Sequence, residues 1–232
     1  MKPLCIALTA ALIGLSPAAQ AQDAPVVVEL FTSQGCSSCP PADAMLLELA
    51  EREDVIALAL HVDYWDYIGW KDPFADPAHT ARQRAYAVRN DRRSIYTPEM
   101  IVGGVTDVVG AKPMELSKAI AQHAEQPDPV TLDLHREGDT LHIKAQVAGK
   151  VDGPMAVHLL RYTPLKSSKI KRGENAGKTL DYANIVEGWK VIEEWDGTAP
   201  LSLTAPISGD KPAVVIIQQG KVGPILAAAR LR

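Results

Sequence analysis

VVVELFTSQGCSSCPP, residues 26–41, sets the architecture of the chain. Its first six residues are apolar except for Glu29, and a nearly continuous apolar run of this length is typical of a strand covered on both faces. A polar turn follows and leads into two cysteines separated by two serines. Pro40 and Pro41 are tolerated in the first turn of a helix, where backbone N–H groups have no intrahelical partner. The stretch predicts a strand, a turn and a helix that begins at Cys36 or Pro40.

The segments that follow continue an alternation of helix and strand. The helix runs to about residue 52, and residues 55–62 form a second apolar run. A strand, a helix and a strand in this order indicate a parallel pair with a right-handed crossover. Two short strands are predicted at 99–102 and 105–109, and a closing helix from about 113 to 125. This half of the chain is therefore predicted to have an α/β fold.

An aromatic loop and a polar helix interrupt the alternation. The loop spans residues 64–74, and the helix spans roughly 77–89. Ligand sites in open α/β sheets lie outside the carboxyl ends of the strands, and this loop follows such an end. The candidate residues for lining a cleft beside the cysteines and selecting a partner are Trp65, Asp66 and Trp70. Equally, the tryptophans could pack beneath the loop without touching a ligand.

The second half of the chain has a different pattern. Residues 126–129, Gln-Pro-Asp-Pro, are predicted to be a linker, because each proline disfavours helix in the residue before it. Strands without intervening helices follow at 131–135, 141–147, 155–162, 189–195, 201–204 and 213–218. Such a series indicates a small antiparallel β-sandwich. We therefore divide the chain into domains at 22–126 and 127–232.

The first 21 residues have the pattern of a Sec-type signal peptide. Lys2 precedes an apolar stretch from Leu4 to Leu15, and Ala19-Gln20-Ala21 is a small-x-small cleavage site. Cleavage near Ala21 predicts a periplasmic or secreted protein. No apolar run reaches the roughly 20 residues that span a bilayer, so no transmembrane segment is expected. The net charge of −4 argues against nucleic acid as a partner.

The cysteine count favours a reactive disulfide. Loss of the signal peptide removes Cys5 and leaves Cys36 and Cys39 as the only thiols. In an oxidising compartment two lone cysteines are expected to pair. Closing so short a loop adds little stability, so reactivity explains the pair better than structure does. A structural or metal-binding pair is the alternative, although a zinc site needs two further strong ligands.

The position of the pair suggests how it reacts. Unpaired N–H groups and the dipole at a helix N-terminus stabilise a thiolate, which is the attacking species, so Cys36 is the candidate nucleophile. Cys39, one turn later, is the candidate resolving thiol. Glu29 lies in a strand that should be buried. Burial would raise the pKa of its carboxyl group, and a raised pKa would suit a proton acceptor for Cys39. A structural partner such as an arginine would explain Glu29 equally well.

These residues resemble the thioredoxin superfamily and, more narrowly, a secreted thioredoxin-like family catalogued as domain of unknown function 1223. The motifs that carry the narrower resemblance are ELFTSQGCSSCPPAD at 29–43, HVDYWD at 61–66 and YTP at 96–98. The resemblance implies a thioredoxin-like fold with a helical insertion at about 64–94, followed by a small antiparallel β-sandwich-like domain. The family name brings no established activity with it.

The resemblance also assigns a role to Thr97 and Pro98. In the thioredoxin-like fold this loop faces the cysteine pair and presents its backbone to the substrate, which implies a cis bond before Pro98. Thr97 before the proline is similar to isomerase- and reductase-type members. The alternative is that Pro98 merely opens a strand.

Two further patterns are not interpreted as functional. Residues 173–179, GENAGKT, look like a P-loop, but one residue is missing between the glycines and no strand-to-helix context surrounds them. We interpret them as a loop between strands. His61 is typical of a core histidine with its hydrogen bonds satisfied, and the spacing of His135, His142 and His158 does not suit a metal.

The expected function is that of an exported thiol–disulfide oxidoreductase, with a preference for a protein-disulfide reductase or isomerase. Its redox group is the Cys36–Cys39 disulfide, with no other cofactor, and its partners are protein or small thiol and disulfide substrates and an unknown electron donor. One alternative is a Cu(I)-binding or copper-delivery protein, because thiolates near Met100 or His61 would suit a soft ion. Another is a binding module with an inert disulfide, in which the second half recruits a partner.

Overall fold

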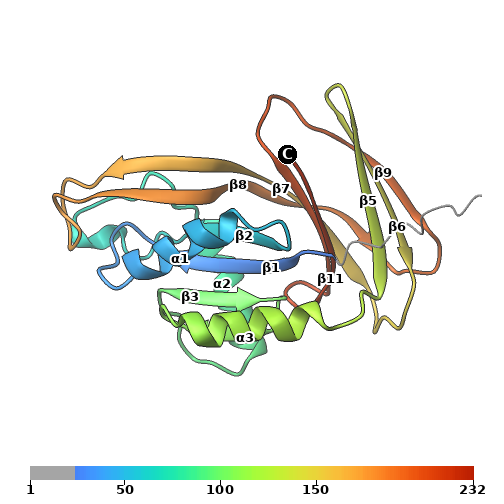
Figure 1. Cartoon of the computed structure of the whole chain (residues 1–232), viewed down its shortest axis with the longest axis horizontal. Coiled ribbons are helices and arrows are strands. Elements are labelled where there is room, and N and C mark those ends of the chain that lie inside the picture. The colour runs from blue at the N-terminus through green and yellow to red at the C-terminus, as the bar shows by residue number, and fades with distance from the viewer. Residues whose placement is uncertain (1–23) are drawn as a thin grey trace, which may run out of the picture.

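The computed structural model of the chain describes residues 24–232 and has a mixed α/β architecture built on one large sheet (Figure 1). The predicted signal peptide lies outside the described residues. No helix within residues 24–232 is long and apolar enough to cross a membrane.

The first strand, helix and strand form as predicted. They are β1 (Val26–Thr32), α1 (Pro40–Ala50) and β2 (Val55–His61). The strands pair in parallel from Val26 opposite Val55 to Thr32 opposite His61, and every residue of both is buried. Burial on both faces explains why neither strand shows a polar–apolar alternation.

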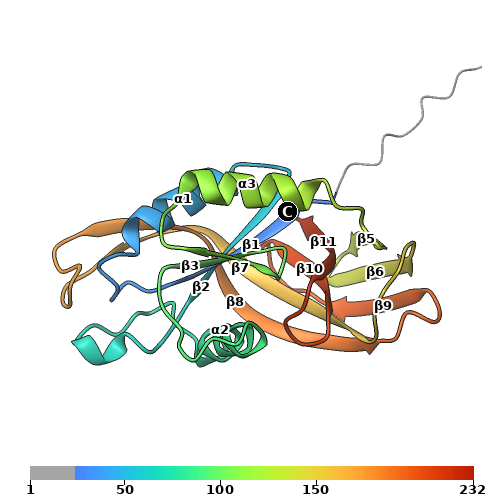
Figure 2. The same ribbon diagram turned by 90° about the horizontal axis from the view of Figure 1, so that it is seen from below.

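Two short strands and a helix complete the other side of β1. They are β3 (Glu99–Val102), β4 (Thr106–Val109) and α3 (Pro113–Ala124). β3 runs antiparallel to β1, which gives the local strand order β2-β1-β3-β4. Helices α1 and α3 cover one face of the sheet, and α2 (Pro77–Arg89) covers the other, below the sheet in Figure 2. Between β2 and α2 the aromatic loop contains a single 3₁₀ turn, η1 (Asp66–Ile68).

The second half does not form a separate sandwich, because most of its strands extend the large sheet. These strands are β7 (Met155–Lys169), β8 (Thr179–Trp195), β10 (Ala213–Gln219) and β11 (Ile225–Leu231). The sheet has eight strands in the order β11-β10-β7-β8-β2-β1-β3-β4, and β8 joins β2 where Ile185 lies opposite Ala59. Only β5 (Val130–Glu137), β6 (Thr140–Val147) and β9 (Leu201–Pro206) form a second, three-stranded sheet.

The strands differ from the prediction in two respects. β7 and β8 form a hairpin far longer than the predicted 155–162 and 189–195, because polar residues such as those at 166–169 continue the pairing where one face is open to solvent. β11 was not predicted. Its three consecutive alanines have little intrinsic preference for a strand, and pairing with β10 supplies the conformation.

Glu29 takes the structural role, with an arginine as its partner. Its side chain leaves β1 on the α2 face, where Arg82 Nε lies 2.6 Å from Glu29 Oε1 and the Tyr86 hydroxyl donates to Oε2 at 2.6 Å. Arg82 also donates to Gln218 of β10 at 2.9 Å and stacks on Trp189 of β8, 4.0 Å from the ring centroid. This buried carboxylate therefore joins α2 to three strands of the sheet.

Removing the Glu29 carboxylate should destabilise the whole fold. Glu29→Gln leaves the Arg82 guanidinium buried without a counter-charge, which costs about 3–5 kcal/mol in comparable sites. We expect urea titration to show that loss in the free energy of unfolding, and Glu29→Met combined with Arg82→Met to recover most of it. The control is Asp54→Asn, which breaks the exposed pair with Arg52 and should cost less than about 1 kcal/mol. Equal stability of Glu29→Gln and the native protein would contradict the role of this ion pair.

Candidate functional site

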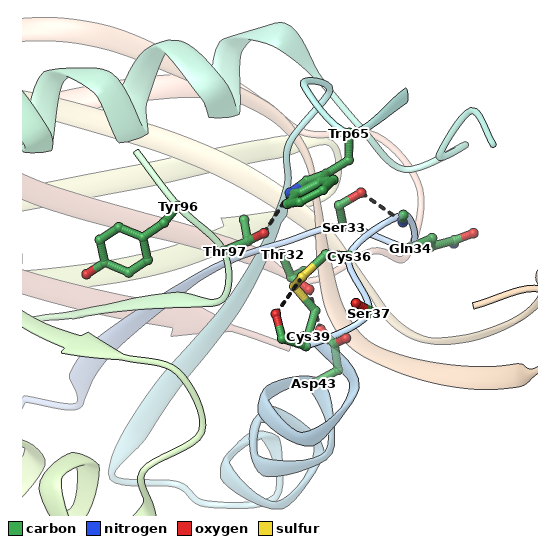
Figure 3. The surroundings of a disulfide bond; sticks show 12 residues. Thr32, Ser33, Gln34, Cys36, Ser37, Cys39, Asp43, Trp65, Tyr96 and Thr97 are labelled. Atoms are coloured by element: carbon green, nitrogen blue, oxygen red, sulfur yellow. Dashed lines mark hydrogen bonds between the residues drawn. A yellow bond between two sulfur atoms is a disulfide. The ribbon is translucent and has the colours of Figure 1, made fainter. Parts of the chain in front are cut away.

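The two cysteines form a disulfide in the turn between β1 and α1 (Figure 3). Cys36 N–H donates to the Ser33 carbonyl at 3.1 Å, and Cys39 N–H donates to the Cys36 carbonyl at 3.3 Å. Cys39 is the N-cap residue of α1, so the helix begins at Pro40 rather than at Cys36. Cys36 is 1% exposed and Cys39 is fully buried, while the serines between them are exposed. The sulfur atoms are therefore shielded, and only the two serines of the turn face the solvent.

The helix N-terminus offers fewer free amides to Cys36 than the sequence analysis assumed. Pro40 and Pro41 have no N–H, and the next two N–H groups, of Ala42 and Asp43, donate to the Cys39 carbonyl. The Ser38 hydroxyl lies 3.5 Å from Cys36 Sγ. A Cys36 thiolate would depend on local groups more than on the helix.

Trp65 lies beside the disulfide (Figure 3). A Cβ added to Gly35 would meet Trp65 Cβ at 3.0 Å, which explains the glycine directly before Cys36. The indole N–H of Trp65 donates to the Thr97 hydroxyl at 2.7 Å. Tyr67, 81% exposed, stacks on Trp65. These rings form an aromatic surface next to the buried sulfurs.

The Thr97-Pro98 peptide bond is cis, as the resemblance implies. Because Phe31 pairs with Glu99, this bond lies beside the end of β1 from which the cysteine turn leaves. Gln83 of α2 holds the loop by donating 2.6 Å hydrogen bonds to the Tyr96 carbonyl and to Glu99. The inserted helix thus anchors the proline loop next to the disulfide.

Trp70 bonds to the turn directly, and Asp66 acts on it through Asp72. The Trp70 indole donates to Gln34 Oε1 at 2.9 Å, and the Gln34 N–H donates to Asp72 at 2.8 Å. Asp66 accepts from the Asp72 N–H at 3.0 Å, within its own loop. Trp70 therefore fixes the residue before Gly35, and Asp66 shapes the loop that carries Asp72.

Asp43 is a buried carboxyl group near the disulfide that the sequence analysis did not identify. It lies one helical turn after Cys39, on the same face of α1, and accepts a 2.7 Å hydrogen bond from the Thr32 hydroxyl (Figure 3). Burial raises its pKa to about 7, and the nearby His61 opposes this rise. The i, i+4 spacing from Cys39 was the available signal. Asp43 stands on the disulfide side of the sheet, whereas Glu29 stands on the opposite side with Arg82.

His61 and Asp72 form a second buried polar pair close to Asp43. His61 Nδ1 lies 2.8 Å from Asp72 Oδ2, and both side chains are fully buried. Within residues 24–232, His61 Nε2 and Asp43 Oδ2 have no hydrogen-bond partner. Coulombic attraction to His61 and hydrogen bonds hold the pKa of Asp72 below its usual range, against the effect of burial. The cluster therefore contains a group that can accept a proton near neutral pH.

No metal centre is evident in the part of the chain that the structure describes, where no group of three or more His, Cys, Asp or Glu side chains is placed to hold an ion. Met100, considered above as a copper ligand, packs in the apolar core with Leu46 of α1.

The chain is similar to a family of unknown function and to solved structures from two organisms. A family model described as protein of unknown function, DUF1223, matches residues 27–218. The crystal structure of an Agrobacterium tumefaciens protein, solved as a structural genomics target, is 32% identical with a TM-score of 0.77 and covers 91% of this chain and 96% of its own. HBP35 of Porphyromonas gingivalis shares the fold at 16% identity, with a TM-score of 0.63 over 91% of this chain and 76% of its own. No curated protein matches significantly.

The raised pKa of Asp43 predicts a pH dependence of stability. Its carboxyl group keeps its proton to about pH 7 in the folded protein but only to about 3.8 in an ordinary environment. The resulting stability is present below about pH 4 and is lost as the pH rises through about 7. Asp43→Asn keeps an acceptor for Thr32 and does not titrate, so at pH 8 we expect it to exceed the native protein by up to about 4 kcal/mol. Urea unfolding of both oxidised proteins at pH 4.5, 6 and 8 tests this, and parallel pH profiles would contradict it.

The bond between Trp65 and Thr97 should slow access to the disulfide. Thr97→Val removes a hydrogen bond with a net value of about 0.5–1.5 kcal/mol, so the loop should open roughly 2- to 12-fold more often. We expect dithiothreitol to reduce the Cys36–Cys39 disulfide faster by about that factor, measured by thiol alkylation over time. Thr131→Val on the exposed face of β5 is the control. An unchanged rate in Thr97→Val would show that this bond does not limit access.

Proposed function

The chain belongs to the DUF1223 family, and we propose that it is an exported thiol–disulfide oxidoreductase with the Cys36–Cys39 disulfide as its redox centre. The supporting observation is the place of this disulfide, between a buried parallel strand and a helix and beside the cis Thr97-Pro98 bond. The strand order β2-β1-β3-β4, with α1 and α3 on one face, supports a thioredoxin-like core, in which residues 64–94, with η1 and α2, would be an insertion.

The reaction consists of two exchange steps. In the dithiol form, the Cys36 thiolate attacks one sulfur of a substrate disulfide, a mixed disulfide forms, and the first substrate sulfur leaves as a thiolate and takes up a proton. Cys39 then loses its proton and attacks Cys36 Sγ, which releases the second substrate sulfur. The substrate gains two electrons, and the protein returns to the disulfide seen here. A dithiol donor reduces it for the next cycle.

Asp43 is the proposed proton acceptor for Cys39. A general base works best when its pKa is near the working pH, and the pKa of about 7 meets this requirement. Glu29, the acceptor considered from the sequence, instead forms an ion pair with Arg82 on the opposite face of the sheet.

Trp65, Tyr67 and Thr97 are the proposed contacts for the substrate. An exposed aromatic surface beside the sulfurs suits an extended or partly unfolded polypeptide that carries the target disulfide. Because Cys36 is almost fully covered and Trp65 lies beside it, we expect this ring to shift before the sulfur is attacked. This requirement favours partners that displace the ring over small disulfides.

Serine variants of the two cysteines test the proposed function. With insulin and dithiothreitol as substrate and donor, we expect Cys36→Ser to fall to the rate of dithiothreitol alone. Cys39→Ser should accumulate a mixed disulfide through Cys36, identified by mass spectrometry of non-reduced peptides. Ser208→Ala, in a loop of the second half, is the control.

Two results would contradict this function. One is a native protein with no activity above dithiothreitol alone. The other is a Cys36→Ser variant with full activity, which would show that Cys36 is not the attacking thiol. Titration of the inactive, reduced protein with Cu(I) would then test the copper alternative.

A further inference from the structure

The sequence that looks like a P-loop lies against the cysteine turn. Residues 170–178, here called the tip loop, connect β7 to β8 at the end of the long hairpin (Figure 1). The tip loop lies more than 130 residues from the cysteines in sequence, yet its side chains bond directly to the turn. Neither a nucleotide site nor the core fold explains these bonds.

Asn175 fixes the tip loop on the turn. Its side chain is 1% exposed, and its amide nitrogen donates to the carbonyl of Gln34 at 3.0 Å and to that of Cys36 at 2.8 Å. Lys178 Nζ donates to the amide oxygen at 2.8 Å, which fixes the orientation of the amide. Both ends of this buried amide are satisfied, so the contact is a built part of the site and not a chance approach of two loops.

Glu174 brings a negative charge to the same turn. Its Oε2 accepts a hydrogen bond from the Ser37 N–H at 3.2 Å. Ser37 directly follows Cys36, so this amide is one of the groups that would stabilise a Cys36 thiolate. Pro40 and Pro41 supply no such N–H, which makes the loss of the Ser37 donor more important.

We propose that the tip loop sets the redox poise of the cysteine pair, an inference that rests on the proposed function. Glu174 occupies the Ser37 donor and places its charge near Cys36, and both effects disfavour the thiolate. A disfavoured thiolate makes the dithiol form less stable relative to the disulfide, so electrons leave the pair more readily. The native protein is therefore poised to reduce other disulfides, with Asn175 holding the carboxylate in place.

Ser38 acts in the opposite direction. Its hydroxyl lies 3.5 Å from Cys36 Sγ in the disulfide and can donate to a thiolate at the same position. Ser37 and Ser38 therefore have different roles, one through its backbone N–H and the other through its hydroxyl. The effect of the Glu174 charge and that of the Ser38 hydroxyl can be separated by substitution, because Glu174→Gln removes only the charge and Ser38→Ala removes only the hydroxyl.

The test measures two properties of the full chain. The pKa of Cys36 is obtained from thiolate absorbance at 240 nm, and the equilibrium of the cysteine pair with glutathione is obtained by alkylation. A charge near a helix N-terminus contributes about 0.3–1 kcal/mol, so Glu174→Gln should lower the Cys36 pKa and shift the equilibrium toward the dithiol about 2- to 5-fold. Ser38→Ala should move both properties the other way.

Controls separate charge from structure. Glu193→Gln removes the same charge at the far end of β8 and should change neither property. Because Glu174 is exposed, the difference between Glu174→Gln and the native protein should shrink in 1 M salt. A difference that is insensitive to salt would indicate a structural effect and overturn the proposal.

The proposal fails if Glu174→Gln leaves both properties within the error of the native values, or if it raises the Cys36 pKa. Neither measurement requires a substrate protein. A chain without insulin reductase activity would therefore overturn the proposed function, while the poise of its cysteine pair would still test the role of the tip loop.

Discussion

The turn that carries the disulfide depends on one buried amide for two of its backbone carbonyl bonds. Asn175 bonds the carbonyls of Gln34 and Cys36 on both sides of Gly35, and no neighbouring strand or helix supplies these two bonds. A buried carbonyl without a donor costs free energy comparable to a lost hydrogen bond, so the turn needs a partner from elsewhere in the chain. The long β7–β8 hairpin delivers that partner at its tip. The site is therefore a joint product of both halves of the chain, although both cysteines come from the first.

Two buried carboxyl groups, Glu29 and Asp43, differ in their properties because different groups surround them. Glu29 and Asp43 are both buried and lie on opposite faces of the same sheet. Glu29 has a guanidinium beside it and holds the fold together. Asp43 has one hydroxyl donor and an oxygen without a partner, and its pKa rises toward neutrality. The two carboxyl groups thus differ in what lies beside them, a guanidinium of α2 next to Glu29 and a single hydroxyl of β1 next to Asp43.

The sequence predicted the parts of the molecule that depend on local patterns. The β1–α1–β2 unit, α2, α3 and the disulfide follow from apolar runs, proline positions and cysteine count. The role of Glu29 depended on Arg82, which is distant in sequence. Asp43 was within reach of prediction through its spacing from Cys39 but was obscured by the stronger signal of Glu29. The contacts of Asn175 and Glu174 with the cysteine turn could not be predicted from the sequence. They depend on the length of the β7–β8 hairpin and on where its tip packs, and long-range strand pairing sets both.

The reduction potential of the Cys36–Cys39 pair tests the central claim most directly. Equilibration of the folded protein with glutathione or dithiothreitol buffers should give a reversible two-electron transition between about −180 and −270 mV, the range of reductase- and isomerase-type dithiols. Resistance to reduction below about −300 mV, or reduction only after unfolding, is the behaviour of a structural disulfide. That result would contradict a redox role for this pair.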